Sequence, residues 1–117
     1  NMSNRFRAYD KMSNEIMKME DDYTFRSNDG RLILNLTEAF QLSRILTIQE
    51  NTRSKDMRGM DIFEGDKVRF NVRGDRKMAN GVVVRQESGA WAVRAENGLE
   101  YLMDDVFCDV KERGGKQ

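Results

Sequence analysis

The fold class is indicated by one stretch of the sequence, Asp61-Ile62-Phe63-Glu64-Gly65-Asp66-Lys67-Val68-Arg69-Phe70. Gly65-Asp66 is typical of a turn, and apolar side chains alternate with charged or polar ones in the residues that follow. One face of this segment would carry Val68, Phe70 and Val72, and the other Lys67, Arg69, Asn71 and Arg73. A period of two predicts a strand that packs on a core with one face and meets water with the other.

Turn signals recur at short intervals through the second half of the chain. They bound strands expected over residues 67–73, 78–86, 90–94, 99–103 and 106–110. Short strands at this spacing predict a small closed β-barrel or roll. Trp91 shares a face with Val93, and Leu99 shares one with Tyr101, so both pairs are expected in its core.

The first half predicts a smaller β-rich region. Strands are expected over residues 5–11 and 15–19 as a hairpin, then over 23–25, 31–36 and 45–49. Thr37 is the expected cap of a short helix near 37–44, and the polar residues 51–59 are expected to form a long exposed loop. The organisation expected is therefore a β-rich subdomain over residues 1–50 and a small β-barrel subdomain over residues 51–117.

Composition points to a thin core and no overall electrostatic attraction to nucleic acid. Of the 117 residues, 38% are hydrophobic and 34% are charged, and the net charge is zero. A core shared between subunits would be one way to thicken it. The longest apolar run is far shorter than the roughly 18 residues of a membrane span, so we expect a soluble, cytoplasmic protein that acts inside a host cell without a membrane partner.

Charge is segregated within the second half. Residues 67–77 hold Lys67, Arg69, Arg73, Arg76 and Lys77 against Asp75 alone. Residues 96–112 hold Glu96, Glu100, Asp104, Asp105, Asp109 and Glu112 against Lys111 alone. These two runs could pair between subunits and set the register of an oligomer, or they could pair within one barrel.

The basic run is the sharpest functional hint in the sequence. Lys67, Arg69 and Arg73 share a strand face, which Arg76 and Lys77 extend past a turn. Small barrels can bind single strands or phosphates on such a surface, but Phe70 alternates inward and leaves the cations without a stacking platform. A solvated face that keeps a strand edge soluble, a surface that docks protein, and a nucleic-acid contact all remain open.

Reactive chemistry has little support. The chain has no histidine, which removes Ser-His and Cys-His nucleophile pairs and the commonest zinc ligand. The single cysteine, Cys108, lies in an alternating apolar run and is expected to be a buried, inert thiol. Adjacent carboxylates such as Asp104-Asp105 would point to opposite faces of a strand. We therefore expect no catalytic residue, no metal and no cofactor.

Three segments together resemble the YopX family of small phage and prophage proteins. The segments are Phe6-Arg7-Ala8-Tyr9-Asp10-Lys11, residues 49–68 with Thr52, Lys55-Asp56, Gly59 and Ile62-Phe63-Glu64-Gly65-Asp66, and Gly81-Val82-Val83. The chain departs from the family pattern at Arg53-Ser54, where Gly-Leu is usual, and at Asp109-Val110-Lys111-Glu112, which replaces the usual ending.

The resemblance implies a β-rich fold with a Src-homology-3-like barrel in the second half, oligomers and a mobile-element origin. It supplies no established activity and no catalytic residues. The resulting hypothesis is a non-catalytic phage or prophage accessory protein that forms a homo-oligomer or binds a phage or host protein. The alternative is a nucleic-acid-binding module that uses the basic strand face of residues 67–77.

Overall fold

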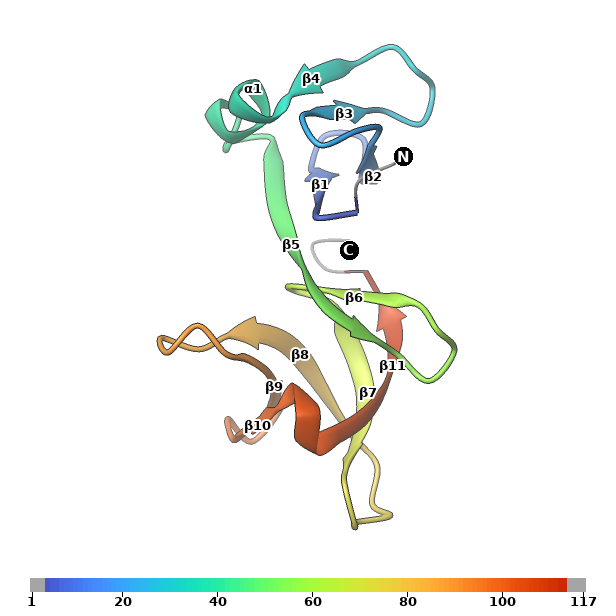
Figure 1. Ribbon diagram of the computed structural model, residues 1–117, viewed down its shortest axis with the longest axis vertical. Helices are drawn as coiled ribbons and strands as arrows, with labels where there is room; N and C mark the ends of the chain where they lie inside the picture. Colours follow the sequence, from blue (N-terminus) through green and yellow to red (C-terminus); the bar gives the residue numbers. More distant parts are fainter. Residues whose placement is uncertain (1–3, 114–117) are drawn as a thin grey trace. The chain divides into compact units, whose positions relative to one another are not determined.

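The computed structural model describes residues 4–113, which form eleven strands, one α-helix and one 3-10 helix (Figure 1). Two antiparallel sheets and the short α-helix make the fold mainly β, as the sequence predicts. The chain divides into two compact units, with the boundary between Asn51 and Thr52. Among residues 4–113, no helix has the length and apolar character needed to cross a membrane.

The first unit is an antiparallel sheet with the strand order β4-β3-β2-β1-β5. Its strands are β1 (Phe6–Asp10), β2 (Glu15–Met19), β3 (Thr24–Arg26), β4 (Ile33–Asn35) and the first part of β5 (Leu46–Lys55). In the central register, Ala8 of β1 lies opposite Met17 of β2 and Ile48 of β5. The predicted hairpin of β1 and β2 is therefore confirmed.

One short helix, α1 (Leu36–Gln41), follows β4 and buries Ala39 in the core of this unit. Its cap is Asn35, whose side chain accepts a hydrogen bond from the Glu38 N–H at 2.8 Å, while the Glu38 carboxylate accepts one from the Asn35 N–H at 3.0 Å. This reciprocal pair is a capping box. The prediction of Thr37 as the cap is wrong: the helix begins at Leu36, so the cap lies two residues earlier, at Asn35.

The second unit contains a five-stranded antiparallel sheet with the order β10-β9-β8-β7-β11. Its strands are β7 (Lys67–Val72), β8 (Ala79–Arg85), β9 (Trp91–Ala95), β10 (Glu100–Leu102) and β11 (Val106–Glu112). The 3-10 helix η1 (Met103–Asp105) joins β10 to β11, and β6 (Asp61–Phe63) pairs with β5. The predicted strand at residues 67–73 is confirmed over residues 67–72, where Val68 and Phe70 are each only 2% exposed, while Arg73 lies beyond its end.

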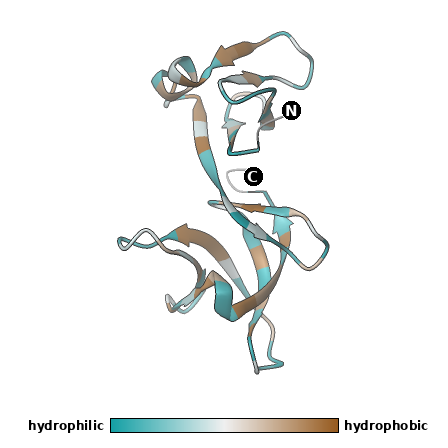
Figure 2. Ribbon diagram, viewed as in Figure 1, coloured by the Kyte–Doolittle hydropathy of each residue, from teal (hydrophilic) through white to brown (hydrophobic). Residues whose placement is uncertain are grey.

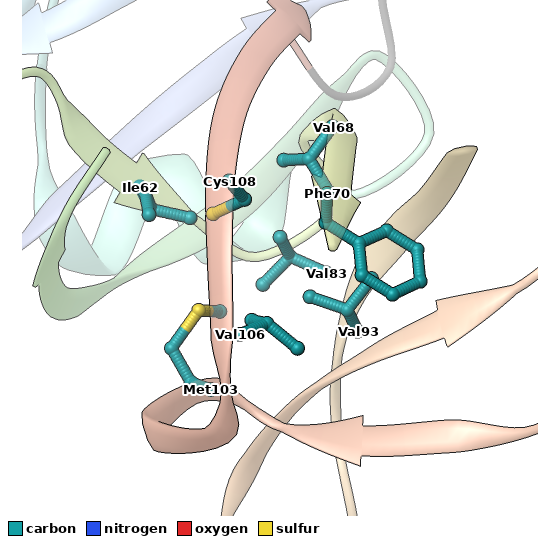
Figure 3. Packing of buried hydrophobic residues seen from close by; sticks show 8 residues of the cluster. All are labelled: Ile62, Val68, Phe70, Val83, Val93, Met103, Val106 and Cys108. Carbon is teal, nitrogen blue, oxygen red and sulfur yellow. The ribbon is translucent and has the colours of Figure 1, made fainter. Parts of the chain in front are cut away.

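The core of the second unit gathers on one face of the five-stranded sheet (Figure 3). The buried residues are Ile62, Val68, Phe70, Val83, Val93, Met103, Val106 and Cys108. Trp91 and Tyr101 pack against this cluster, as expected. The expectation for Leu99 is wrong: Leu99 follows the turn at Gly98, precedes the first residue of β10, and is 56% exposed.

The closed barrel expected from the sequence is not found. β10 pairs with β9 and β11 pairs with β7, and within residues 4–113 no strand pairing joins β10 to β11. The far edge of β11 is instead covered by the segment that follows β5, where the Met57 N–H donates to the Cys108 carbonyl at 3.1 Å. The sheet is therefore open between its first and last strands.

The exposed loop expected over residues 51–59 is wrong for its first half. β5 continues to Lys55, and Asn51, Thr52 and Asp56 are all buried. Polar side chains can be buried when their hydrogen bonds are made inside the protein, so polarity alone misidentified this segment. On β5 the side chains of Arg53 and Lys55 are exposed, and the exposed loop itself is residues 57–60.

Candidate functional site

The candidate basic residues lie on β7 and in the loop that follows it. Lys67 and Arg69 are exposed on β7, on the face opposite the core. Arg73, Arg76 and Lys77 lie beyond the end of the strand, in the β7–β8 loop that Figure 2 colours mainly hydrophilic. Strand geometry puts the start of β7 about 20 Å from Arg73. The five cations therefore do not form one compact patch.

Antiparallel pairing of β7 with β11 brings carboxylates beside the cations of the strand. Lys67 Nζ lies 3.5 Å from a Glu112 carboxylate oxygen, and Arg69 is the register partner of Asp109. Part of the acidic run thus pairs with the basic run inside the same unit, which was one of the two arrangements left open by the sequence. Exposed pairs of this kind contribute little stability, but they lower the local positive potential.

Arg73 is fixed by β11 and by the segment before it. Its N–H donates to the Asp105 carbonyl at 2.7 Å, and its guanidinium donates to the Asp104 carbonyl at 3.1 Å. The guanidinium also lies over the ring of Phe107, 4.6 Å from its centroid. Phe107 is 39% exposed, so a cation and an aromatic ring share this part of the surface.

Arg76 and Lys77 are exposed cations in the β7–β8 loop. Both side chains are exposed and form no ion pair with any residue between 4 and 113. The loop that carries them is held by Asp75, whose carbonyl accepts from the Asn71 side chain at 2.8 Å and whose carboxylate accepts from the Lys77 N–H at 2.9 Å. They form a small basic tip rather than a channel.

Asp56 is the residue that sequence reasoning missed most completely. Its carboxylate accepts hydrogen bonds from the N–H groups of Arg58 (2.9 Å), Met60 (2.8 Å) and Val110 (3.2 Å). Burial alone would raise the pKa of Asp56, but these backbone donors and the Arg58 guanidinium outweigh it and hold the pKa below its usual value. The carboxylate thus fixes the 56–60 turn and attaches it to β11.

The other residues that carry the family resemblance also hold the main chain. Thr52 Oγ1 donates to the Ile62 carbonyl at 2.7 Å and joins β5 to β6. The fully buried Asp66 accepts from the Phe63 N–H at 2.9 Å, across a turn in which Gly65 has a φ of +86°. A positive φ is easily adopted only by glycine. These residues organise the entry into β7.

Gly81 is required by close packing. A Cβ at this position would lie 2.6 Å from Val93 Cγ1, 2.7 Å from the Arg94 carbonyl oxygen and 3.1 Å from a ring carbon of Phe70. The approach of β9 to β8 therefore depends on the missing side chain. The glycine that begins the third segment of the resemblance has a packing role.

No reactive constellation accompanies these residues. Burial, together with the nearby carboxylates of Asp56, Asp109 and Asp66, raises the pKa of the Cys108 thiol to about 11, so the thiol stays protonated at neutral pH. Between residues 4 and 113, no three side chains among His, Cys, Asp and Glu are grouped closely enough to hold a metal ion.

Two of the hollows in the surface of the second unit adjoin candidate basic residues. One, of about 370 Å³, is lined by residues that include Lys55, Arg73 and Phe107. The other, of about 610 Å³, has Val82 and Val84 in its lining and the Lys67–Glu112 ion pair at its side. The Cys108 thiol in the first stays protonated, and the Asp56 carboxylate there is already bonded to the main chain. Neither hollow therefore joins a free nucleophile to a base.

A comparison with protein families matches the chain over residues 5–113 to the family described as YopX protein. No curated protein and no solved structure matches the chain. The match covers both units and all three segments that carry the resemblance.

Proposed function

The chain belongs to the YopX family, and from that membership and the geometry above we propose that it is a non-catalytic phage or prophage accessory protein. It acts inside the host cell by binding proteins, including copies of itself. The observation that carries this proposal is the role of the family-type residues: Thr52, Asp56 and Asp66 bond to the main chain, and none of them faces a reactive group.

Exposed apolar side chains support a binding role. Tyr23 (72% exposed), Met57 (70%), Leu99 (56%), Phe40 (52%) and Ile33 (50%) all stand in solvent. Single exposed apolar residues are common. A chain with two small cores and this many large apolar side chains in solvent, however, has apolar surface that a partner could cover. Association with other subunits or proteins would bury it.

We also propose that the five-stranded sheet is a partly open version of the Src-homology-3-like barrel that the family resemblance implies. Five short antiparallel strands follow one another in the order β10-β9-β8-β7-β11, and β10 passes into β11 through η1. All five strands contribute buried or partly buried side chains to a single core. A curved sheet with its core inside is the arrangement that such a barrel requires.

Light scattering after size exclusion tests self-assembly. The proposal expects a defined multimer over micromolar concentrations, and association with a phage or host protein when lysate of infected cells is fractionated with the tagged chain. A monomer at every concentration that also co-fractionates with no protein would contradict the proposal.

A second candidate function, nucleic-acid binding, is favoured by the basic tip. Arg76 and Lys77 are exposed, and the Arg73–Phe107 pair lies at the adjoining end of β7. Fluorescence anisotropy with single- and double-stranded DNA and RNA at two salt concentrations tests it. This function expects binding that weakens steeply with salt and is lost in the double variant Arg76→Glu, Lys77→Glu, and no binding at low salt rejects it.

A further inference from the structure

The two edges of the five-stranded sheet differ in how their backbone groups are satisfied. Along β11, the Cys108 carbonyl accepts from Met57, the Val110 N–H donates to Asp56, and the Val110 carbonyl accepts from Arg58. β10 pairs with β9 alone, and its outer edge bonds to no other strand between residues 4 and 113. Figure 1 shows β10 at one end of the sheet. One edge is covered, and the other is open for a further strand.

The side chains along β10 do not protect this edge. Leu99, just before β10, and Leu102, its last residue, are 56% and 45% exposed. Glu100 turns to its own sheet, where it accepts hydrogen bonds from the side chains of Arg94 at 2.9 Å and Gln86 at 3.1 Å. Lysine and proline are the residues that usually block edge pairing, and residues 99–103 contain neither.

Carboxylates without ion-pair partners lie at both ends of β10. Glu96 precedes the strand, and Asp104 and Asp105 follow it in η1. All three side chains are exposed and form no ion pair within the described part of the chain. The nearest cation on the neighbouring strand, Arg94, is already paired with Glu100. Carboxylates that form no ion pair therefore lie at both ends of the open edge, with the Arg73 guanidinium bound to the main-chain carbonyl of Asp104 at one of them.

We propose that the β10 edge binds an extended basic segment of a partner protein, which adds to the sheet as a sixth strand. Main-chain hydrogen bonds would join the segment to β10, its apolar side chains would cover Leu99 and Leu102, and its lysines or arginines would face Glu96 at one end and Asp104 at the other. Strand addition of this kind derives affinity from the main chain and specificity from alternate side chains. The inference rests on the proposed protein-binding function and names the class of partner.

The test is an NMR titration of the ¹⁵N-labelled full chain with two synthetic peptides of about nine residues, the length of a long strand. One peptide alternates lysine with valine, and the other has glutamate in place of each lysine. We expect the basic peptide to shift the backbone amide resonances of Glu100, Tyr101 and Leu102, and the acidic peptide to leave them unchanged.

Matched variants separate the edge from general stickiness. Leu102→Lys puts a cation on the edge and should raise the Kd for the basic peptide at least about tenfold, a change of ~1.4 kcal/mol. Ile33→Lys makes the same change on β4, which is the edge strand of the other sheet and carries a residue that is 50% exposed. That variant should bind like the parent. The double variant Glu96→Lys, Asp104→Lys tests how much these two charges contribute to binding of the basic peptide, and it leaves the residues of β10 unchanged.

Several results would overturn the inference: equal binding of both peptides, shifts that map outside residues 99–105, or equal losses in Leu102→Lys and Ile33→Lys. Shifts of residues 100–102 that depend on protein concentration without any peptide would assign the edge to a second copy of the chain and reject a basic partner. Light scattering distinguishes this inference from the proposed function. A chain that forms a multimer but does not bind the basic peptide would overturn only this inference.

Discussion

The Asp56 carboxylate accepts a hydrogen bond from the Val110 N–H at 3.2 Å, although 54 positions separate the two residues in the sequence. The same carboxylate accepts from Arg58 and Met60 in its own turn. One buried side chain thus anchors a loop and satisfies an edge of β11. This explains why an aspartate is needed in a segment that looks like solvent-exposed loop.

Replacing Asp56 with alanine should destabilise the second unit by roughly 2–4 kcal/mol, because several backbone donors would lose a charged acceptor at once. Urea unfolding followed by Trp91 fluorescence would measure the change. The matched control is Glu87→Gln, which alters an exposed carboxylate in the β8–β9 turn and should leave the unfolding midpoint almost unchanged. Equal midpoints for Asp56→Ala and the parent would contradict this role.

The pH dependence of stability should carry the signature of Asp56. Its pKa in the folded chain is lowered, so its contribution is complete above the ordinary aspartate pKa and is lost as the pH falls toward the lowered value. The free energy of unfolding of the parent should therefore decrease below about pH 4. In Asp56→Asn part of that decrease should be missing, and an identical pH profile in the two proteins would argue against the assignment.

The hydroxyl of Thr52 should contribute more to stability than its methyl group. Thr52→Val removes the donor to the Ile62 carbonyl, and it should cost about 1–2 kcal/mol because that carbonyl is left without its partner. Thr52→Ser keeps the hydroxyl and should cost clearly less. Thermal unfolding of the two variants provides the comparison, and a serine variant as unstable as the valine variant would mean that the methyl group, not the hydrogen bond, is important.

Gly81 should tolerate no side chain. Gly81→Ala would place a Cβ against the Arg94 carbonyl oxygen, which belongs to the main chain of β9 and cannot rotate away. We expect a loss of about 1–3 kcal/mol from overpacking, measured by urea unfolding. Val82→Ala, at the next position on the exposed face, should change stability by less than half as much. The reverse order would show that β8 and β9 can separate freely.

The helix cap provides a test between two neighbouring residues. Asn35→Ala removes the side chain that accepts from the Glu38 N–H and should destabilise the first unit by about 0.5–2 kcal/mol. Thr37→Ala should have little effect, because Thr37 is exposed inside the helix and makes no capping bond. Hydrogen exchange of amides in residues 36–41 would report on this helix directly. A larger effect at Thr37 would reject the capping box.

Periodicity was a sufficient guide where one face of a strand meets solvent. The alternation of Val68 and Phe70 with Lys67 and Arg69 predicted β7 correctly, because burial and charge there follow the pleat of the strand. The hairpin of β1 and β2 was predicted from apolar residues on either side of a turn. Periodicity placed Leu99 wrongly, since an apolar residue beside a turn can stay outside the core.

Hydrogen-bonded polar residues were beyond the reach of such patterns. Thr52 and Asp56 are buried because the Ile62 carbonyl and the Val110 N–H pair with them, and those partners come from other strands. The surroundings of the basic run, residues 67–77, likewise depend on long-range pairing. The sequence shows the cations of residues 67–77, but only the register of β7 with β11 places Glu112 and Asp109 beside them.

We propose that this chain acts by binding proteins and that its family-type residues serve the fold. Light scattering after size exclusion, over a hundredfold range of micromolar concentrations and with the folded state of each sample checked by its NMR spectrum, tests it most directly. We expect a folded chain that forms a defined multimer or a stable complex with a phage or host protein. A folded chain that remains a monomer at every concentration and forms no such complex would contradict it.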